Sequence, residues 1–403
     1  MLRRRSRAAF LGAGVLALSL LGTATGSAVV EPFEWAGPGK SAERTAFNWR
    51  SGLTPTNVAT LHRSWGVGGG VFTPPIIADG IIVAGDNGGT GRTRLRALDA
   101  DTGAVVWTKA YGSSTTAKVS APSTSGSLVF VTVERATILG WIYDLYAYDL
   151  HDGDLVWDAE IGVANRGTGP RDVLFTSGRV ITPTASGNGF KRLAVYQAST
   201  GYWRYSVTPG GNISAFAANS AVAYVATKTA IEVYDLDTGS NVNTILGGAG
   251  STSIIVSASG IYATPPNRVV NYDSTGFVTF NRQLTAGCNA RMRVLTPKMV
   301  GYSQDCGTAA KPEFLQRGTP APAMLPGGVA NGDRPVAAAQ QFIVAVTGNR
   351  ALKFWDTRAP RLGQTLTTPT LASGANITTT GGPIVAAGKL IVPEVAGLEV
   401  FIV

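Results

Sequence analysis

The chain has 403 residues and combines 50 glycines with 44% hydrophobic and only 15% charged residues. The apolar content excludes an intrinsically disordered chain, and many glycines with few charges favour short strands and tight turns over helices. The formal net charge is +9. No cluster of Lys and Arg interleaves with aromatic residues, so nucleic-acid binding is not expected.

The N-terminus has the three parts of a secretory signal peptide. A run of arginines precedes an apolar stretch from Ala8 to Leu21, and small residues follow through Ala28. We therefore predict a signal peptide over residues 1–28 and a secreted or extracytoplasmic protein, with a retained membrane anchor as the alternative. No later segment reaches about 18 uninterrupted apolar residues, so the mature chain is expected to have no membrane span. Loss of the four arginines of the signal peptide lowers the net charge from +9 to +5.

An N-terminal segment over residues 29–60 is expected to precede a repeat region over residues 61–403. Each repeat has an alternating strand, a polar turn that usually ends in glycine, and a second strand. In the first copy Asp99, Thr102 and Gly103 make the turn, because Asp and Thr can bond nearby backbone N–H groups and Gly supplies a positive φ. The copies begin at Arg94, Asp144, Arg192, Ala230, Val269 and Ala351. Another strand pair precedes each hairpin, and four strands in about 35–50 residues are typical of a propeller blade.

The two ends of the repeat region predict how the ring closes. The last repeat stops at Val403 without a fourth strand, while Leu61–Gly66 forms a strand without a hairpin partner. We predict that this N-terminal strand completes the last blade, which leaves no sheet edge exposed. The expected fold is an all-β propeller of about eight four-stranded blades, with seven as the fallback. Residues 29–44 are expected to contribute little to its stability.

The hairpins resemble the PQQ-like, quinoprotein-type β-propeller repeat family. The pattern A-x-D-x-x-T-G-x-x-x-W is present from Ala97 to Trp107, and a divergent copy runs from Ala147 to Trp157. Residues 48–65, NWRSGLTPTNVATLHRSW, are similar to the segment that leads into quinoprotein propellers. The resemblance covers about residues 45–403, is most specific in the first three blades, and implies the propeller fold.

Quinone-dependent dehydrogenases of this fold need more than the propeller. The resemblance implies that an active member would have two adjacent cysteines beside the cofactor, with Glu, Asn and Asp around a calcium ion. The two cysteines here, Cys288 and Cys306, are 18 positions apart. No catalytic Asp of that family can be placed on this sequence. We therefore predict no cofactor, with PQQ and calcium as the alternative.

Large aromatic residues recur near the ends of the repeats. Such rings bury about 150–250 Å² each, and their shared position favours packing between blades over a stacking platform for a sugar or quinone. The residues expected to dock neighbouring blades are Trp65, Trp107, Trp157, Trp203 and Phe280. Trp141 and Trp355 fall outside the pattern and are the better candidates for exposed contacts.

The residue types needed for catalysis are scarce. His62 and His151 are the only histidines, and neither is expected to form a Ser-His-Asp or Cys-His site. The acidic turns recur at one repeat position, so we interpret them as turn caps, with calcium ligands as the alternative. Cys288 and Cys306 are expected to form a disulfide in an exported protein, with two separate buried thiols as the alternative.

These observations favour an exported, non-catalytic propeller that binds partners in the cell envelope or outside the cell. A protein or a cell-envelope polymer is the expected partner, because rigid rings with variable loops suit binding. We expect the protein to be a monomer. A PQQ-dependent oxidoreductase-like protein and a propeller hydrolase or lyase acting on polysaccharide are the alternatives.

Overall fold

The computed structural model describes residues 36–403, apart from residues 38, 42, 49, 89–90, 166, 259, 297–298, 306–309, 317–333, 340, 349–350, 359–364, 368, 370, 372–375 and 378–381. The predicted signal peptide lies outside the described residues. Within them, regular structure is almost entirely β, with two short 3-10 turns, η1 (Val58–Thr60) and η2 (Leu246–Gly248). The all-β prediction is confirmed. None of the helical segments in this part of the chain is long and apolar enough to cross a membrane.

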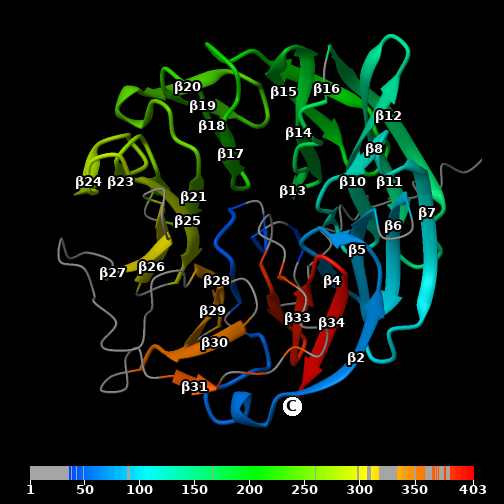
Figure 1. The fold of residues 1–403 in the computed structure, drawn as a ribbon. Helices are drawn as coiled ribbons and strands as arrows, with labels where there is room; N and C mark the ends of the chain where they lie inside the picture. Colours follow the sequence, from blue (N-terminus) through cyan, green and yellow to red (C-terminus); the bar gives the residue numbers. More distant parts are fainter. Residues whose placement is uncertain are drawn as a thin grey trace, which may run out of the picture.

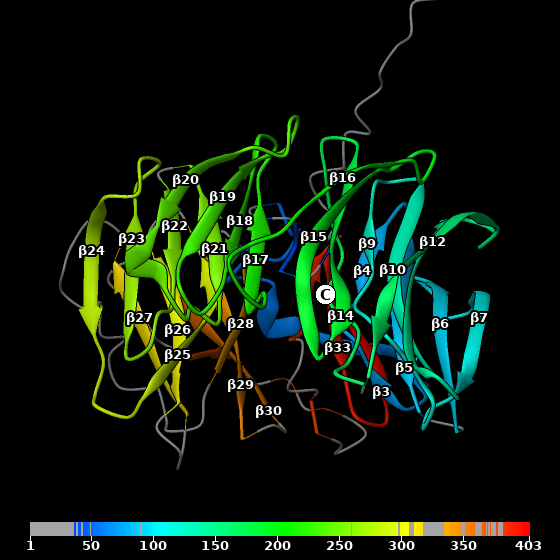
Figure 2. The ribbon, with the colours of Figure 1, turned by 90° about the horizontal axis from the view of Figure 1, so that it is seen from above.

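The sheets stand around a common centre, which is the arrangement of a β-propeller (Figure 1). In the view turned by 90°, the strands run roughly along the axis of the ring (Figure 2). Five of the seven described sheets have four or five strands, the size of one blade. In chain order, four of these five consist of β3 (Val71–Phe72), β4 (Ile76–Ala78), β5 (Ile81–Asn87), β6 (Arg92–Asp99) and β7 (Val105–Ser113); β17 (Ala215–Ala218), β18 (Val222–Ala226), β19 (Ile231–Asp235) and β20 (Asn241–Ile245); β21 (Ile254–Ser257), β22 (Gly260–Ala263), β23 (Arg268–Tyr272) and β24 (Val278–Gln283); and β28 (Arg334–Ala339), β29 (Phe342–Thr347), β30 (Ala351–Asp356) and β31 (Thr365–Thr367) with β1 (Phe47–Asn48).

The fifth of these blades closes the ring. It contains β32 (Ile384–Ala386), β33 (Lys389–Pro393) and β34 (Gly397–Ile402), and its outer strand is β2 (His62–Gly68). β2 pairs antiparallel with β34, from His62 opposite Ile402 to Gly68 opposite Gly397. The N-terminal strand therefore completes the last blade, as the sequence predicts.

The blade count differs from the prediction. Besides the five separate blades, the described strands form one nine-stranded and one three-stranded sheet, so the expected eight blades, or seven, are not seen as separate units. The nine-stranded sheet contains β8 (Ala117–Val119), β9 (Ser123–Thr124), β10 (Leu128–Thr137), β11 (Gly140–Asp149), β12 (Leu155–Ala164), β13 (Leu174–Thr176), β14 (Arg179–Gly187), β15 (Gly189–Gln197) and β16 (Trp203–Val207), and the three-stranded sheet contains β25 (Asn289–Leu295), β26 (Met299–Asp305) and β27 (Ala310–Gln316).

The nine-stranded sheet arises because two neighbouring repeats hydrogen-bond to each other. Strands β12 and β14 are long enough to pair in parallel over Gly162–Ala164 and Ala185–Gly187. Gly162 has a φ of +123°, and a Cβ there would lie 2.1 Å from the Ala185 carbonyl oxygen. Only glycine permits this close approach, so a single residue type allows the two repeats to fuse.

Apolar side chains fill the spaces between neighbouring sheets. One buried cluster joins Val83 and Leu95 of the first blade to Val131 and Tyr148 of the nine-stranded sheet. Trp355 is fully buried, and Trp141 is half-buried and packs against the core of the nine-stranded sheet. The expectation that these two tryptophans make exposed contacts was therefore wrong for Trp355.

The acidic residues of the repeats organise their turns. Asp99 Oδ1 accepts hydrogen bonds from the backbone N–H groups of Asp101 (3.1 Å) and Thr102 (2.8 Å) and from the Thr102 hydroxyl (2.7 Å). Asp235 makes the same set of bonds with its own turn. The bonds from Thr102 hold the pKa of the Asp99 carboxyl below its usual value. This geometry agrees with the interpretation of these carboxylates as turn caps.

The predicted disulfide between Cys288 and Cys306 can be tested by mass spectrometry. Cys288 is 2% exposed and packs in a core cluster, whereas Cys306 lies outside the described residues, so the bond stays a prediction. The intact mass of the unreduced mature protein is expected to be lower than that of the reduced protein by the mass of two hydrogen atoms. Reaction of both cysteines with a thiol reagent in the native, unreduced protein would contradict this prediction.

Candidate functional site

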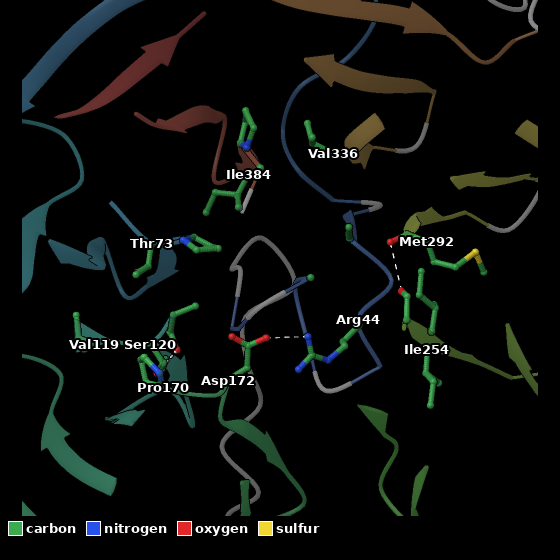
Figure 3. Close-up of a pocket in the computed structure, with 18 of the residues that line it drawn as sticks. Arg44, Thr73, Val119, Ser120, Pro170, Asp172, Ile254, Met292, Val336 and Ile384 are labelled. Atoms are coloured by element: carbon green, nitrogen blue, oxygen red, sulfur yellow. Dashed lines mark hydrogen bonds and ion pairs between the residues drawn. The ribbon is translucent and has the colours of Figure 1, made fainter. Parts of the chain in front are cut away.

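A pocket of about 350 Å³ lies at the centre of the ring (Figure 3). Residues of six different sheets line it, and Arg44 of the N-terminal segment lines it as well. The labelled lining residues from the sheets and their loops are Thr73, Val119, Ser120, Pro170, Asp172, Ile254, Met292, Val336 and Ile384. The central position makes this pocket the first candidate for a functional site.

The N-terminal segment crosses this centre and bonds to sheets on several sides. The Ala36 carbonyl accepts from Thr124 N–H at 2.8 Å, and the Glu43 carbonyl accepts from Val256 N–H at 2.9 Å. The Ala46 carbonyl accepts from the backbone of β28 at 2.8 Å. Three non-glycine residues of the segment, Lys40, Arg44 and Ala46, have positive φ values. Such conformations persist only where surrounding contacts hold them. The segment is therefore a fixed part of the wall of the central pocket.

Arg44 and Asp172 form the charged pair of the pocket. Their Nη1 and Oδ2 atoms are 2.9 Å apart, and both side chains are partly exposed. The Arg44 guanidinium also lies over the Phe216 ring, at 5.0 Å from its centroid. A second pocket of about 260 Å³ has both charged residues and Phe216 among its lining residues. The ion pair therefore stands between two polar cavities and satisfies the carboxylate of Asp172.

The residues that line the central pocket do not fit a calcium–quinone centre. Calcium prefers six to eight oxygen ligands with several carboxylates, and Asp172 is the one carboxylate among the residues that line the main pocket. Within the described part of the chain, no three residues of the types His, Cys, Asp and Glu come together to hold a metal ion.

The histidines lie away from this pocket. His62 is exposed in β2, and His151 lies in a surface turn, where its Nε2 is 2.7 Å from Asp79 Oδ2. Neither residue is among those that line the main pocket. Among these lining residues there is no arrangement of nucleophile, base and orienting group.

The tryptophans at the ends of the repeats contact the turn of the next repeat. Trp107 donates its indole N–H to the Leu150 carbonyl at 2.7 Å, and Trp157 donates to the Ala198 carbonyl at 2.8 Å. Trp65 makes the same type of bond to Ala100 at 3.2 Å, although it is less buried. Each ring covers the turn glycine of the repeat that it contacts.

Trp203 does not dock a blade, which corrects the prediction. Its side chain is 54% exposed, while Tyr205, two residues later, covers Gly239 and donates its hydroxyl to the Leu236 carbonyl at 2.7 Å. The docking ring stands four residues after the turn glycine, at Trp107, Trp157, Tyr205 and Phe280. Phe280 is half-buried against the core cluster that contains Cys288.

A second candidate surface lies on the hairpin between β10 and β11. These strands have ten residues each, against five in β18 and β19. Ile138 and Leu139 form the tip and are 101% and 88% exposed. Apolar side chains exposed at a hairpin tip are not explained by packing, and such exposure marks an interaction site when it is clustered.

Sequence reasoning missed the central ion pair and this hairpin tip. The signal for the tip was available, because Ile138 and Leu139 stand between two long alternating strands where a turn usually has polar residues. The Arg44–Asp172 pair joins residues 128 positions apart, and no local pattern could indicate it.

The family model described as "Outer membrane protein assembly factor BamB" matches residues 43–160 and 143–290, more than half of the chain. No curated protein sequence matches this chain. The described fold is similar to quinohemoprotein alcohol dehydrogenase ADHIIG from Pseudomonas putida HK5, at 12% identity and a TM-score of 0.66, over 92% of this chain and 80% of that chain.

Two further solved structures are similar over nearly their full length. BamB from Moraxella catarrhalis matches at 16% identity and a TM-score of 0.56, over 86% of this chain and 98% of that chain. Sqt1 from Saccharomyces cerevisiae matches at 10% identity and a TM-score of 0.59, over 84% of this chain and 98% of that chain. At these identities, each likeness concerns the fold alone.

Proposed function

The chain belongs to the PQQ-like propeller family whose model is named after the outer membrane protein assembly factor BamB, and we propose that it is an exported, non-catalytic scaffold that binds a protein partner. The observation that carries this proposal is the apolar tip of the β10–β11 hairpin, with Ile138 and Leu139 exposed to solvent. The name of the family, which refers to an assembly factor, supports a protein as the partner.

The hairpin is built to hold this tip rigidly. Ten consecutive residue pairs join β10 to β11, and β12 pairs with the other side of β11 as far as Trp141. Thr137 bridges the turn, because its hydroxyl donates to the Gly140 carbonyl at 2.9 Å. Rigid presentation lowers the entropy cost of binding, so the tip suits a pocket on a folded partner.

A photo-crosslinking amino acid at position 139 tests this proposal. We expect it to form a covalent adduct with one predominant protein in the source cells, and we expect the double change Ile138→Asp with Leu139→Asp to weaken the association of that protein at least tenfold. Apolar anchors at the centre of an interface often account for 2 kcal/mol or more of the binding free energy. The measurement is the adduct's identity by mass spectrometry, followed by titration of the purified partner.

The matched control places the same crosslinker at Thr229, in the equivalent hairpin between β18 and β19. Thr229 is exposed but is flanked by no exposed apolar pair. Equal adduct yield at positions 139 and 229, or unchanged affinity of the double variant, would refute the role of the hairpin tip.

Several expectations from the sequence belong to the same proposal. Residues 1–28 would direct export and be removed from the mature chain, which would act as a monomer without a bound quinone or metal. The ring would contain eight repeat units, because the nine-stranded sheet contains two repeats and the three-stranded sheet one. The aromatic rings that follow the turn glycines would dock these units to one another.

A further inference from the structure

A groove in the nine-stranded sheet is separate from the central pocket and from the hairpin tip. It has a volume of about 390 Å³ and lies where β12 and β14 meet, with walls from β12, β14, β15 and β16. We infer that this groove is a saccharide-binding site. Its volume lies in the range of about 300–1,000 Å³ that is usual for small-molecule sites.

Trp203 supplies an aromatic surface to the groove. It lies two residues after its turn glycine, and the same position holds Val105, Leu155 and Val278 in other repeats. All four side chains are between 52% and 55% exposed, so this position faces outward. Only the repeat that borders the groove places an indole there among these four, and packing between blades does not require it.

The strand register places a second ring behind Trp203. Trp203 is the cross-strand partner of Tyr196, and directly opposed residues of an antiparallel pair lie on the same face of the sheet. Tyr196 is 5% exposed, lines the groove and stacks on the docked Trp157, with ring centroids 6.3 Å apart. A buried aromatic ring therefore lies on the same face of the sheet as the exposed indole.

The polar side chains of the groove complement hydroxyl groups. Glu160 and Arg192 both line it, and neither side chain forms an ion pair or hydrogen bond within the described part of the chain. A carboxylate accepts hydrogen bonds only, and a guanidinium donates them only. Thr184, Ser186 and Ser206 add hydroxyls that do both. Together they can bond to sugar hydroxyls, which are donors and acceptors at once.

The charge balance favours a neutral saccharide over a nucleic acid or an anionic ligand. Glu160 and Arg192 cancel each other, so the groove has no excess of positive charge to attract phosphates. The face of an indole is negatively polarised, and the C–H groups on one face of a pyranose ring carry small positive charges. A neutral sugar can therefore stack on Trp203 while its hydroxyls bond to the polar rim.

The test uses the full mature protein and soluble neutral oligosaccharides of glucose, N-acetylglucosamine and mannose as probes. An array screen selects the strongest binder, and calorimetric titration measures its affinity. We expect saturable binding that Trp203→Ala weakens at least tenfold and that Glu160→Gln and Arg192→Met each weaken several-fold. Because Trp203 is exposed, thermal melting of the Trp203→Ala variant should match that of the parent protein.

Tyr202→Ala is the matched control, since Tyr202 is 70% exposed and does not line the groove. Its affinity for the saccharide should equal that of the parent protein. The inference is overturned if no oligosaccharide binds at millimolar concentration, if Trp203→Ala binds normally, if Tyr202→Ala weakens binding equally, or if the groove binds a peptide instead. The double variant of Ile138 and Leu139 should retain saccharide binding, so failure here and failure of the proposed protein scaffold are distinguishable.

Discussion

Replacing Trp107 or Trp157 by alanine is expected to lower the free energy of unfolding by about 3–5 kcal/mol, as large-to-small changes in protein cores do. Both side chains are at most 8% exposed. Each indole fills the space above a turn glycine and donates to a backbone carbonyl of that turn. Truncation therefore leaves a cavity and removes the hydrogen-bond partner of a carbonyl. Urea unfolding curves, monitored by far-UV circular dichroism, measure the loss in the free energy of unfolding.

Trp203→Ala provides a control with the same chemical change. Its outward position predicts a difference within about 0.5 kcal/mol of the parent protein, as for most surface substitutions. Trp107→Phe keeps most of the ring but loses the bond to Leu150, which should cost roughly 1–3 kcal/mol if the carbonyl is left without a partner. Equal stability of the Trp107→Ala and Trp203→Ala variants would show that the docking ring contributes no more than a surface side chain.

The docking rings also show how far repeat patterns can be used without a structure. The repeat pattern predicts the position of the hairpins. In the third copy, however, it predicts Trp203 as the docking ring in place of Tyr205. A bulge follows the turn in several repeats, for example between Ala97 and Leu98, and it inserts an extra residue before the docking position. Counting four residues from the glycine corrects this prediction.

The arrangement around the central pocket could not be predicted from the periodicity of the repeats. Parallel pairing of β12 with β14 depends on two strands extending beyond the usual blade length and on Gly162, which a period of four strands does not indicate. The contacts of Ala36, Glu43, Arg44 and Ala46 depend on backbone N–H groups and side chains from distant parts of the chain. Ala36, Glu43 and Arg44 bond across the ring, so we expect residues 29–44 to contribute more to stability than the sequence alone predicts.

Deletion of residues 29–66 is expected to give aggregation or a sharply lowered melting temperature. It removes most of β2, whose pairing with β34 joins segments more than 300 positions apart. The remaining edge of β34 would expose backbone donors and acceptors that can pair with other molecules. It also removes Trp65, which donates to the Ala100 carbonyl of the first blade. Scanning calorimetry and light scattering measure the two outcomes.

A shorter deletion of residues 29–44 separates the effect of ring closure from the effect of the contacts in the central pocket. It retains β2 but removes the Arg44–Asp172 pair and the bonds from Thr124 and Val256 to this segment. Single hydrogen bonds contribute about 0.5–1.5 kcal/mol each, and exposed ion pairs contribute less. We therefore expect a moderate fall in melting temperature without aggregation. The longer deletion additionally removes residues 45–66, which include most of β2. If it melts no lower than the shorter one, pairing of β2 with β34 does not stabilise the ring.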